Sequence, residues 1–242
     1  MNTVIAKHLG EIEYGKAWDL QEQYMKRGLE IKSKRFQGTS DNIDEIHHYL
    51  FLCEHPHVYT LGKSGALENL LINNERMKEL GVSFYKTNRG GDITYHGPGQ
   101  MVAYPVLDLE QFFTDLGKYM RALEESIIGT LSTYGIQAGR LEGSTGVWLD
   151  PETPGKARKI CAMGVRSSRW ITMHGLALNI NTDLQFFNHI VPCGIVDKGV
   201  TSMEKELGRK LDEAEVRTEF MRNFARVFDV ALKPFKEEVL VH

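Results

Sequence analysis

The sequence predicts an α+β fold, in which a layer of strands packs against a few helices, rather than a doubly wound parallel sheet. Two observations support this prediction. Short strand-like segments follow one another through tight glycine and proline turns, and only a few segments with helical spacing of apolar residues interrupt them. With 242 residues, 42% of them hydrophobic, the chain can bury a large core. We therefore expect one domain spanning residues 1–242, without internal repeats or linkers.

The first elements are a strand and an amphipathic helix. We expect a short strand over Val4–Leu9 and a helix over Tyr14–Lys26. The apolar face of that helix carries Ala17, Leu20, Tyr24 and Met25. Dense aromatic and aliphatic residues then predict extended segments at His48–Glu54 and His57–Leu61, separated by Pro56.

Three more strands are predicted around the most glycine-rich stretch of the chain. They cover Val82–Thr87, Asp92–His96 and Met101–Leu107. The turn Arg89-Gly90-Gly91 joins the first two, and Gly97-Pro98-Gly99 joins the last two.

The second half of the chain holds two long helices and three strands. Apolar residues at helical spacing predict a helix over Leu116–Tyr134, stopped by Gly135, and a final helix over about Glu213–Phe228. An exposed loop, DPETPGKA, is expected at 150–157. The predicted strands are Val147–Leu149, Lys159–Val165 and Ile171–Ile180.

Composition and charge exclude several classes of protein. The formal net charge is -3, from 29 basic and 32 acidic residues, so no overall positive field favours a nucleic-acid partner. No apolar run approaches the roughly 18 residues of a membrane span. Glu11 and Glu13 interrupt the N-terminus too early for a signal peptide. The spacing of Cys53, Cys161 and Cys193 indicates free thiols, so we expect a cytoplasmic protein.

Two motifs that would indicate nucleotide binding fail on spacing. Gly62-Lys63-Ser64 lacks the glycine that a phosphate-binding loop needs five positions before its second glycine, because His57 stands there. Gly97-Pro98-Gly99 lacks the last glycine of a dinucleotide fingerprint. The glycines must serve another purpose.

A group of histidines suggests a metal only weakly. His47, His48, His55 and His57 lie close together in sequence, but no cysteine or carboxylate is spaced to complete a familiar zinc set. We expect these histidines to be exposed or hydrogen-bonded at strand ends, and we predict no metal site.

The segment RGGDITYHGPGQ, residues 89–100, is the best candidate for a ligand site. It holds five glycines or prolines, whereas a plain turn needs one or two. Glycine lets a backbone approach a ligand closely, and Arg89, Thr94, His96 and Gln100 supply polar groups beside it. The alternative is two adjacent tight turns.

Two of the three cysteines are candidate nucleophiles. Cys53 lies inside an apolar strand and is expected to be inert. Strand alternation puts Cys161 on one face with Lys159 and Met163, so a cation stands two positions from this thiol. Cys193 lies in a Pro-Cys-Gly turn, which presents a thiol in a pocket. These arguments do not decide between Cys161 and Cys193.

Four segments occur in an order that resembles the lipoyl(octanoyl) transferases. They are RGGDITYHGPGQMVAYPVLDL, KICAMGV, HGLALNINTDL and FNHIVPCGI, and the resemblance runs from about His55 to Ser202. It implies the catalytic fold of biotin and lipoate protein ligases, with a mixed, mostly antiparallel sheet flanked by helices.

The resemblance also implies an activity and its residues. An octanoyl group would pass from octanoyl-acyl carrier protein, through a thioester on Cys193 activated by Lys159, to a lysine of a lipoyl domain. The implied acceptors are the E2 subunits of 2-oxoacid dehydrogenases and the glycine cleavage H protein, and no cofactor or metal is implied. The implied substrate-binding residues are Arg89, Gly90, Gly91, Asp92, Ile93, Thr94, Tyr95, His96, Ala162, Met163, Gly164, Gly175, Leu176 and Ala177.

Two departures from the family pattern and two alternative functions remain. The 150–157 loop is longer than is usual in the family. Cys161 stands where the family pattern has a small apolar residue, and its thiol allows a disulfide with Cys193 under oxidation. An ATP-dependent lipoate ligase would need no nucleophilic cysteine. A silent module that binds lipoyl domains or carrier proteins would not need Lys159 or Cys193 either. For an acidic carrier, we expect a basic surface drawn from Arg140, Arg158, Arg166 and Arg169.

Overall fold

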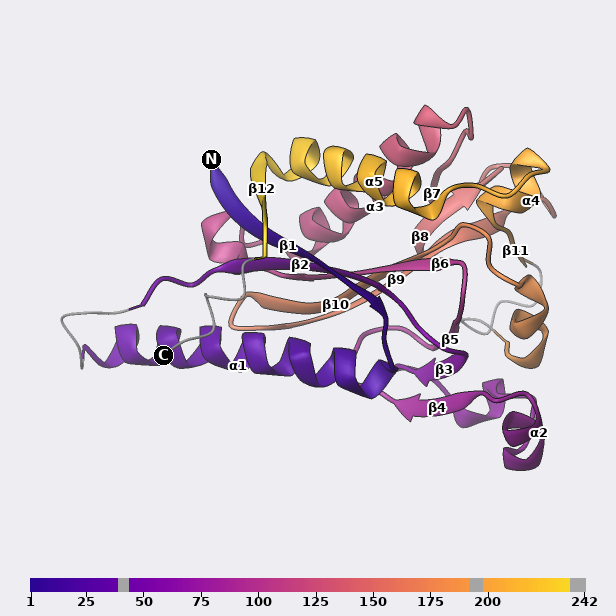
Figure 1. Ribbon diagram of the computed structural model, residues 1–242, viewed down its shortest axis with the longest axis horizontal. Helices are drawn as coiled ribbons and strands as arrows, with labels where there is room; N and C mark the ends of the chain where they lie inside the picture. The colour runs from indigo at the N-terminus through magenta and orange to yellow at the C-terminus, as the bar shows by residue number, and fades with distance from the viewer. Residues whose placement is uncertain (39–43, 192–197, 236–242) are drawn as a thin grey trace.

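A mixed β-sheet crosses the centre of the molecule, with helices on both of its faces (Figure 1). The computed structural model describes residues 1–38, 44–191 and 198–235. Within these residues the sheet has nine strands, in the order β12-β1-β2-β6-β10-β9-β8-β7, and β11 pairs with β9. Most neighbouring strands run antiparallel, whereas β1 runs parallel to both β2 and β12. The predicted α+β class is confirmed.

The strands of this large sheet come from the whole length of the chain. Several of them match the predicted segments within a few residues. Their bounds are β1 Asn2–Glu11, β2 His48–Glu54, β6 Gln100–Val106, β7 Gly139–Leu141, β8 Ser144–Leu149, β9 Arg158–Ser168, β10 Ile171–Asn179, β11 Gly199–Val200 and β12 Val230–Pro234.

A second, three-stranded sheet lies beside the N-terminal end of the first helix (Figure 1). It is formed by β3 (Val58–Leu61), which pairs with both β4 (Ser83–Lys86) and β5 (Ile93–His96). Because β5 belongs to this small sheet and β6 to the large one, the turn Gly97-Pro98-Gly99 carries the chain from one sheet to the other. The residues between β4 and β5 therefore form a loop at the border of the two sheets.

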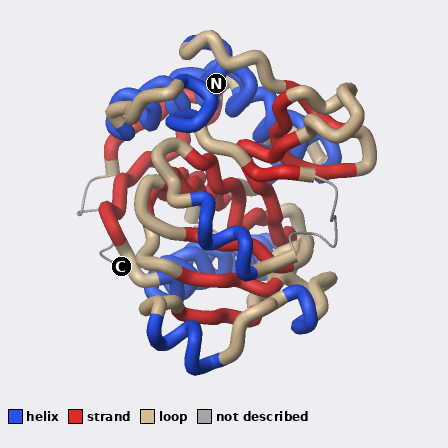
Figure 2. The backbone as a smooth tube through the Cα atoms, turned by 90° about the vertical axis from the view of Figure 1, so that its right-hand side faces the viewer, coloured by secondary structure: helices blue, strands red, loops and turns tan. Residues whose placement is uncertain are grey.

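Helices cover each face of the large sheet with a separate apolar core. Figure 2 shows the strands between helices at the top and bottom of the view. Helices α3 (Leu116–Thr133) and α5 (Glu213–Phe228) pack on one face through residues such as Leu123 and Phe220. Helix α1 (Tyr14–Gln37) packs on the other face, where Met25 contributes to the core. The short helices α2 (Asn74–Glu79) and α4 (Met203–Leu207) lie outside these layers.

Helix α1 extends well beyond the predicted end at Lys26. It continues to Gln37 and ends at Gly38, whose φ of 63° is the left-handed conformation typical of a helix C-cap. Gly28 lies inside the helix and costs about 1 kcal/mol relative to alanine there. A Cβ on Gly28 would lie 2.6 Å from the Cδ1 atom of Ile171, so its missing side chain lets α1 approach β10. Tertiary packing thus overrides a weak local helix signal.

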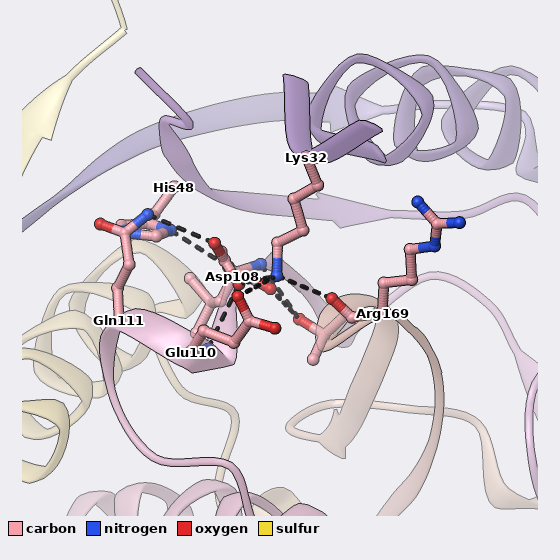
Figure 3. Close-up of polar contacts among 8 residues, drawn as sticks. Lys32, His48, Asp108, Glu110, Gln111 and Arg169 are labelled. Atoms are coloured by element: carbon pink, nitrogen blue, oxygen red, sulfur yellow. Dashed lines mark hydrogen bonds and ion pairs between the residues drawn. The ribbon is translucent and has the colours of Figure 1, made fainter. Parts of the chain in front are cut away.

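A buried ion pair fixes the second half of α1 to the sheet. The Lys32 Nζ lies 2.5 Å from Asp108 Oδ1 and 3.0 Å from Glu110 Oε2, and it donates to the carbonyl oxygen of Arg169 at 2.7 Å (Figure 3). The backbone N–H of Asp108 in turn donates to His48 Nδ1. This cluster lies where β6 ends and β10 begins, because Asp108 forms a bridge with Ile171.

The histidines that lie close together in sequence have different hydrogen-bond partners in the structure. His48 lies at the start of β2, whereas His55 bonds the Ile12 carbonyl and the Tyr104 hydroxyl, and His57 bonds the Tyr95 hydroxyl. In the described ranges, no three His, Cys, Asp or Glu side chains gather as metal ligands do. Over the same ranges, no helix has the length and apolar character needed to cross a membrane.

Candidate active site

A pocket of about 780 Å³, including its open mouth, lies where the small sheet meets the large one. Its floor is built from β6, β9 and β10, and its cover is the segment between β4 and β5. Small residues form much of the floor, among them Ala162, Gly164, Gly175 and Ala177. Such a floor leaves room for a narrow, flexible ligand beside the sheet.

The covering loop is fixed to β9 by backbone contacts. The Gly90 N–H donates to the carbonyl oxygen of Val165 at 2.9 Å. A Cβ on Gly164 would lie only 2.6 Å from the Gly90 carbonyl oxygen, so glycine is needed for this close approach. The Arg89 guanidinium donates to both the carbonyl and the hydroxyl oxygen of Thr60, at 2.7 and 2.9 Å. These contacts hold Arg89 and the following glycines over the pocket floor.

Most of the residues assigned to substrate binding from the sequence lie around this pocket. Two of the fourteen do not line it. Gly90 contacts β9 through its backbone, and Tyr95 is buried in the core of the small sheet with its hydroxyl against His57. The twelve that line it are Arg89, Gly91, Asp92, Ile93, Thr94, His96, Ala162, Met163, Gly164, Gly175, Leu176 and Ala177. The fold therefore brings three segments, distant in sequence, to one cavity.

Lys159 also lines the pocket, at the start of β9. It is paired across the ladder with Trp148 of β8, and its Nζ lies 4.6 Å from the centroid of the indole ring. Cys193, the other predicted catalytic residue, lies outside the described residues. The structure thus gives a position for the lysine of the predicted pair and none for the cysteine.

A chain of buried polar groups forms part of the pocket wall. His96 Nδ1 lies 2.8 Å from Gln100 Oε1, and the Gln100 amide donates to Asn179 Oδ1 at 2.9 Å. Asn179 donates onward to the carbonyl oxygen of Thr201. Burial lowers the pKa of His96 to about 3, so its ring is neutral near pH 7. A neutral imidazole here keeps this wall uncharged.

His174 is held in a strained conformation beside the pocket. It has a φ of 59°, and its backbone N–H donates to the Gln21 side-chain oxygen of α1. His174 Nε2 lies 2.6 Å from Asn88 Oδ1, so the proton belongs on Nε2 and Nδ1 is a lone-pair acceptor. Burial lowers the pKa of His174 to about 3. Nδ1 has no hydrogen-bond partner among the described residues.

Sequence reasoning missed several residues of the pocket wall. Tyr14 reaches it from the start of α1, where its ring stacks on His96, and burial raises its pKa to about 12. The proximity of α1 to this loop has no local signal in the sequence. The remaining wall residues not assigned to substrate binding are Gln100, Val102, Tyr104, His174, Asn179, Phe187 and Val200. Of these, only Gln100 was singled out as a polar group of the glycine-rich segment.

The two cysteines in the described residues are buried. Cys161 is 0% exposed within the core beneath α3 and α5, and burial raises the pKa of its thiol. Cys53 is 1% exposed, and burial raises its pKa as well. Neither thiol forms a thiolate readily, which is a poor property for a nucleophile.

Three of the four arginines predicted to form a basic surface make ion pairs with carboxylates. Arg140 bonds Glu124 and Glu125, Arg158 bonds Asp150 and Glu206, and Arg166 bonds Glu22. Arg169 lies with Lys32 at the far end of α1 (Figure 3). These carboxylates offset part of the positive charge of Arg140, Arg158 and Arg166, and the basic surface stays a prediction.

Comparisons with known proteins identify the family of this chain and match its fold. The model of the lipoyl protein ligase A/B catalytic domain matches residues 13–225. An octanoyltransferase from Flavobacterium johnsoniae is 55% identical over 93% of this chain and 96% of its own length. A putative lipoate protein ligase structure from Thermoplasma acidophilum superposes with a TM-score of 0.66 at 16% identity, covering 98% of this chain and 90% of that one. For a biotin protein ligase from Aquifex aeolicus with biotin and ATP, the TM-score is 0.51 at 13% identity, with 93% and 70% covered.

Proposed function

Because the chain belongs to the lipoyl protein ligase A/B catalytic-domain family and is an acyltransferase, we propose that it transfers an octanoyl group to a lysine of lipoyl domains. The donor in this proposal is octanoyl-acyl carrier protein. The acceptors are the lipoyl domains of 2-oxoacid dehydrogenase E2 subunits and the glycine cleavage H protein. Cys193 carries the acyl group between the two, and Lys159 moves the protons.

One observation supports the proposal most strongly, namely the pocket that Lys159 shares with the loop from Arg89 to His96 and with the AMG and GLA segments. A floor rich in glycine and alanine suits an unbranched acyl chain, because these small residues leave room beside the sheet. An ammonium group in the same pocket suits a reaction that ionises a thiol and protonates a leaving group. Transfer from an octanoyl thioester needs both a site for the acyl chain and a group that transfers protons.

In the first half-reaction, the Cys193 thiolate attacks the carbonyl carbon of the donor thioester. The bond from that carbon to the carrier's sulfur breaks, and the departing thiolate takes a proton from the Lys159 ammonium. One thioester replaces another, so the acyl group stays activated at little net cost. A free thiol has a pKa of about 8.5, and a nearby ammonium favours its thiolate at neutral pH.

In the second half-reaction, a lysine amine of the lipoyl domain attacks the thioester on Cys193. Lys159, now neutral, accepts a proton from that amine, while the carbon–sulfur bond breaks and Cys193 leaves as a thiolate. The Cys193 thiolate and the Lys159 ammonium are then restored for the next cycle. Backbone N–H groups of the glycine-containing segments hold the oxyanion that forms in each step.

The competing function is an ATP-dependent ligase that activates free octanoate. The two are distinguished by incubating a lipoyl domain with octanoyl-acyl carrier protein alone, or with octanoate and ATP. Octanoylation of the domain with the carrier thioester and no ATP supports the proposal. Octanoylation that occurs only with octanoate and ATP would overturn it. A protein that only binds lipoyl domains or carrier proteins would octanoylate the domain under neither condition.

Two variants test the assigned roles. Cys193→Ala should form no acyl-enzyme, whereas Lys159→Ala should form one slowly at high pH, where the thiol ionises without help. Intact mass after incubation with donor, followed by peptide mapping, locates the thioester. An acyl group found on Cys161, with Cys193 unmodified, would contradict the assignment. Cys53→Ala serves as a control, since Cys53 lies in a separate core beneath α1.

A further inference from the structure

The aromatic residue opposite Lys159 has a geometry that points to a role in the reaction. β8 and β9 are antiparallel, and their register pairs Trp148 with Lys159. The Lys159 Nζ lies 4.6 Å from the centroid of the Trp148 ring, within the roughly 6 Å reach of a cation–π interaction. Trp148 is 2% exposed, so the ring face is shielded from water. Shielding strengthens the attraction between an ammonium and an indole face.

Neighbouring residues of β8 fix this arrangement. The Trp148 indole N–H donates to the carbonyl oxygen of Ser144 at 3.2 Å, which sets the orientation of the ring. A Cβ on Gly146, which has a φ of 119°, would lie 2.6 Å from the Cys161 carbonyl oxygen and in ordinary contact with the Lys159 Cε atom at 3.4 Å. The Gly146 N–H donates to Glu124, a fully buried carboxylate that also binds Arg140. Gly146 thus lets β8 approach the β9 backbone closely beside Lys159, and Glu124 anchors the strand.

We propose that Trp148 is a positioning residue for the acyl transfer, and that its indole face holds the Lys159 ammonium at the pocket. This inference rests on the proposed function, in which that ammonium favours the Cys193 thiolate and protonates the leaving thiol. The ring attracts an ammonium and not a neutral amine, so it orients the charged Lys159 side chain at the pocket. It acts through Lys159 and does not touch the substrate in this role.

A second lysine provides an internal control. The Lys198 Nζ lies 5.8 Å from the centroid of the same ring, farther than that of Lys159. Substituting Trp148 perturbs both contacts, whereas Lys198→Met removes only the more distant one. If Trp148 acts through Lys159, Lys198→Met should leave the pH dependence of acylation in place.

The test compares Trp148→Leu, Trp148→Phe and the wild-type protein in single-turnover acylation by octanoyl-acyl carrier protein between pH 6 and 10. Loss of the aromatic face should slow acylation about 2- to 30-fold. It should also change the pH dependence of the acylation rate, because the ring no longer holds the Lys159 side chain in place. Phenylalanine keeps a face but not the indole N–H, so Trp148→Phe should recover part of both effects.

Two further measurements keep the test decisive where Trp148→Leu fails to fold. Site-specific replacement of Trp148 by 5,7-difluorotryptophan keeps the shape and the N–H donor but weakens the negative face, and it should shift the pH curve in the same direction. In a Lys159→Ala background, removing the ring should cost little more, since the two residues act as one unit. An additive loss, or equal defects in the Leu and Phe variants, would overturn the inference.

These outcomes separate the inference from the function on which it rests. A wild-type protein that does not octanoylate a lipoyl domain contradicts the proposed function itself. A Lys159→Ala protein with normal acylation contradicts the role of the lysine. If both of those results agree with the proposal but the difluorotryptophan protein has a wild-type pH profile, the positioning role of Trp148 alone is wrong.

Discussion

Gly164→Ala should damage the pocket through a single added methyl group. That methyl would stand 2.6 Å from the Gly90 carbonyl oxygen, which is 0.8 Å short of an ordinary 3.4 Å contact. The obstacle is backbone, so the loop that begins at Arg89 must move outward. Overpacking of this kind costs about 1 to 3 kcal/mol, and a shift approaching 1 Å at a reacting site can lower the rate by about 100-fold.

The matched control is Gly90→Ala, on the other side of the same contact. A Cβ on Gly90 would lie 3.4 Å from the Val165 carbonyl oxygen, so alanine fits there. We expect Gly164→Ala to lower kcat/KM for octanoyl transfer about 10- to 100-fold. It should also lower Tm by roughly 2 to 10 °C, while Gly90→Ala changes both little. Steady-state transfer to a lipoyl domain and thermal unfolding monitored by circular dichroism measure these effects. Equal behaviour of the two variants would refute the close-approach argument.

Three more predictions follow from other parts of the structure. Gly91→Leu should lower acyl transfer with the fold intact, as circular dichroism would show, because φ at Gly91 is 87° and a leucine would enter the pocket. His96 is neutral when folded and titrates near 6.5 when unfolded, so its contribution to stability is complete above pH 6.5 and falls towards pH 3. Urea unfolding from pH 4 to 8 measures this dependence. Below pH 6.5, the free energy of unfolding of the wild-type protein should fall more steeply than that of His96→Gln, by about 1.4 kcal/mol per pH unit. Lys32→Ala leaves Asp108 buried without its cation and should cost about 3 to 5 kcal/mol, yet the folded variant should retain normal kcat/KM.

Local patterns in the sequence predicted those elements that form from local interactions. The bounds of α5 and β2 match the prediction, and α3 differs by one residue. Amphipathic spacing and a glycine stop are properties of neighbouring residues, so the sequence displays them directly. In contrast, β12 pairs in parallel with the first strand of the chain, and no local signal marks such a partner.

Turn signals located the glycine loops but not the sheets that they connect. Gly97-Pro98-Gly99 was identified as a turn between two strands, and it is one, but the strands lie in different sheets. A turn reports that the chain changes direction, whereas the choice of partner strand depends on the whole fold. The same limit explains why Tyr14 and His174, brought to the pocket by helix packing, were missed, while the motif-bearing segments were found.

The pocket wall is divided between two sheets, so the pocket can change its width while the large sheet keeps its stability. The ladder hydrogen bonds of the large sheet run within that sheet, while the cover contacts it through links such as Gly90 with Val165 and Asn88 with His174. Breaking a few such links costs far less than global unfolding, so the cover can open as a local event. Substitutions in the covering loop are therefore a route to enzymes that accept longer or bulkier acyl groups on an unchanged scaffold.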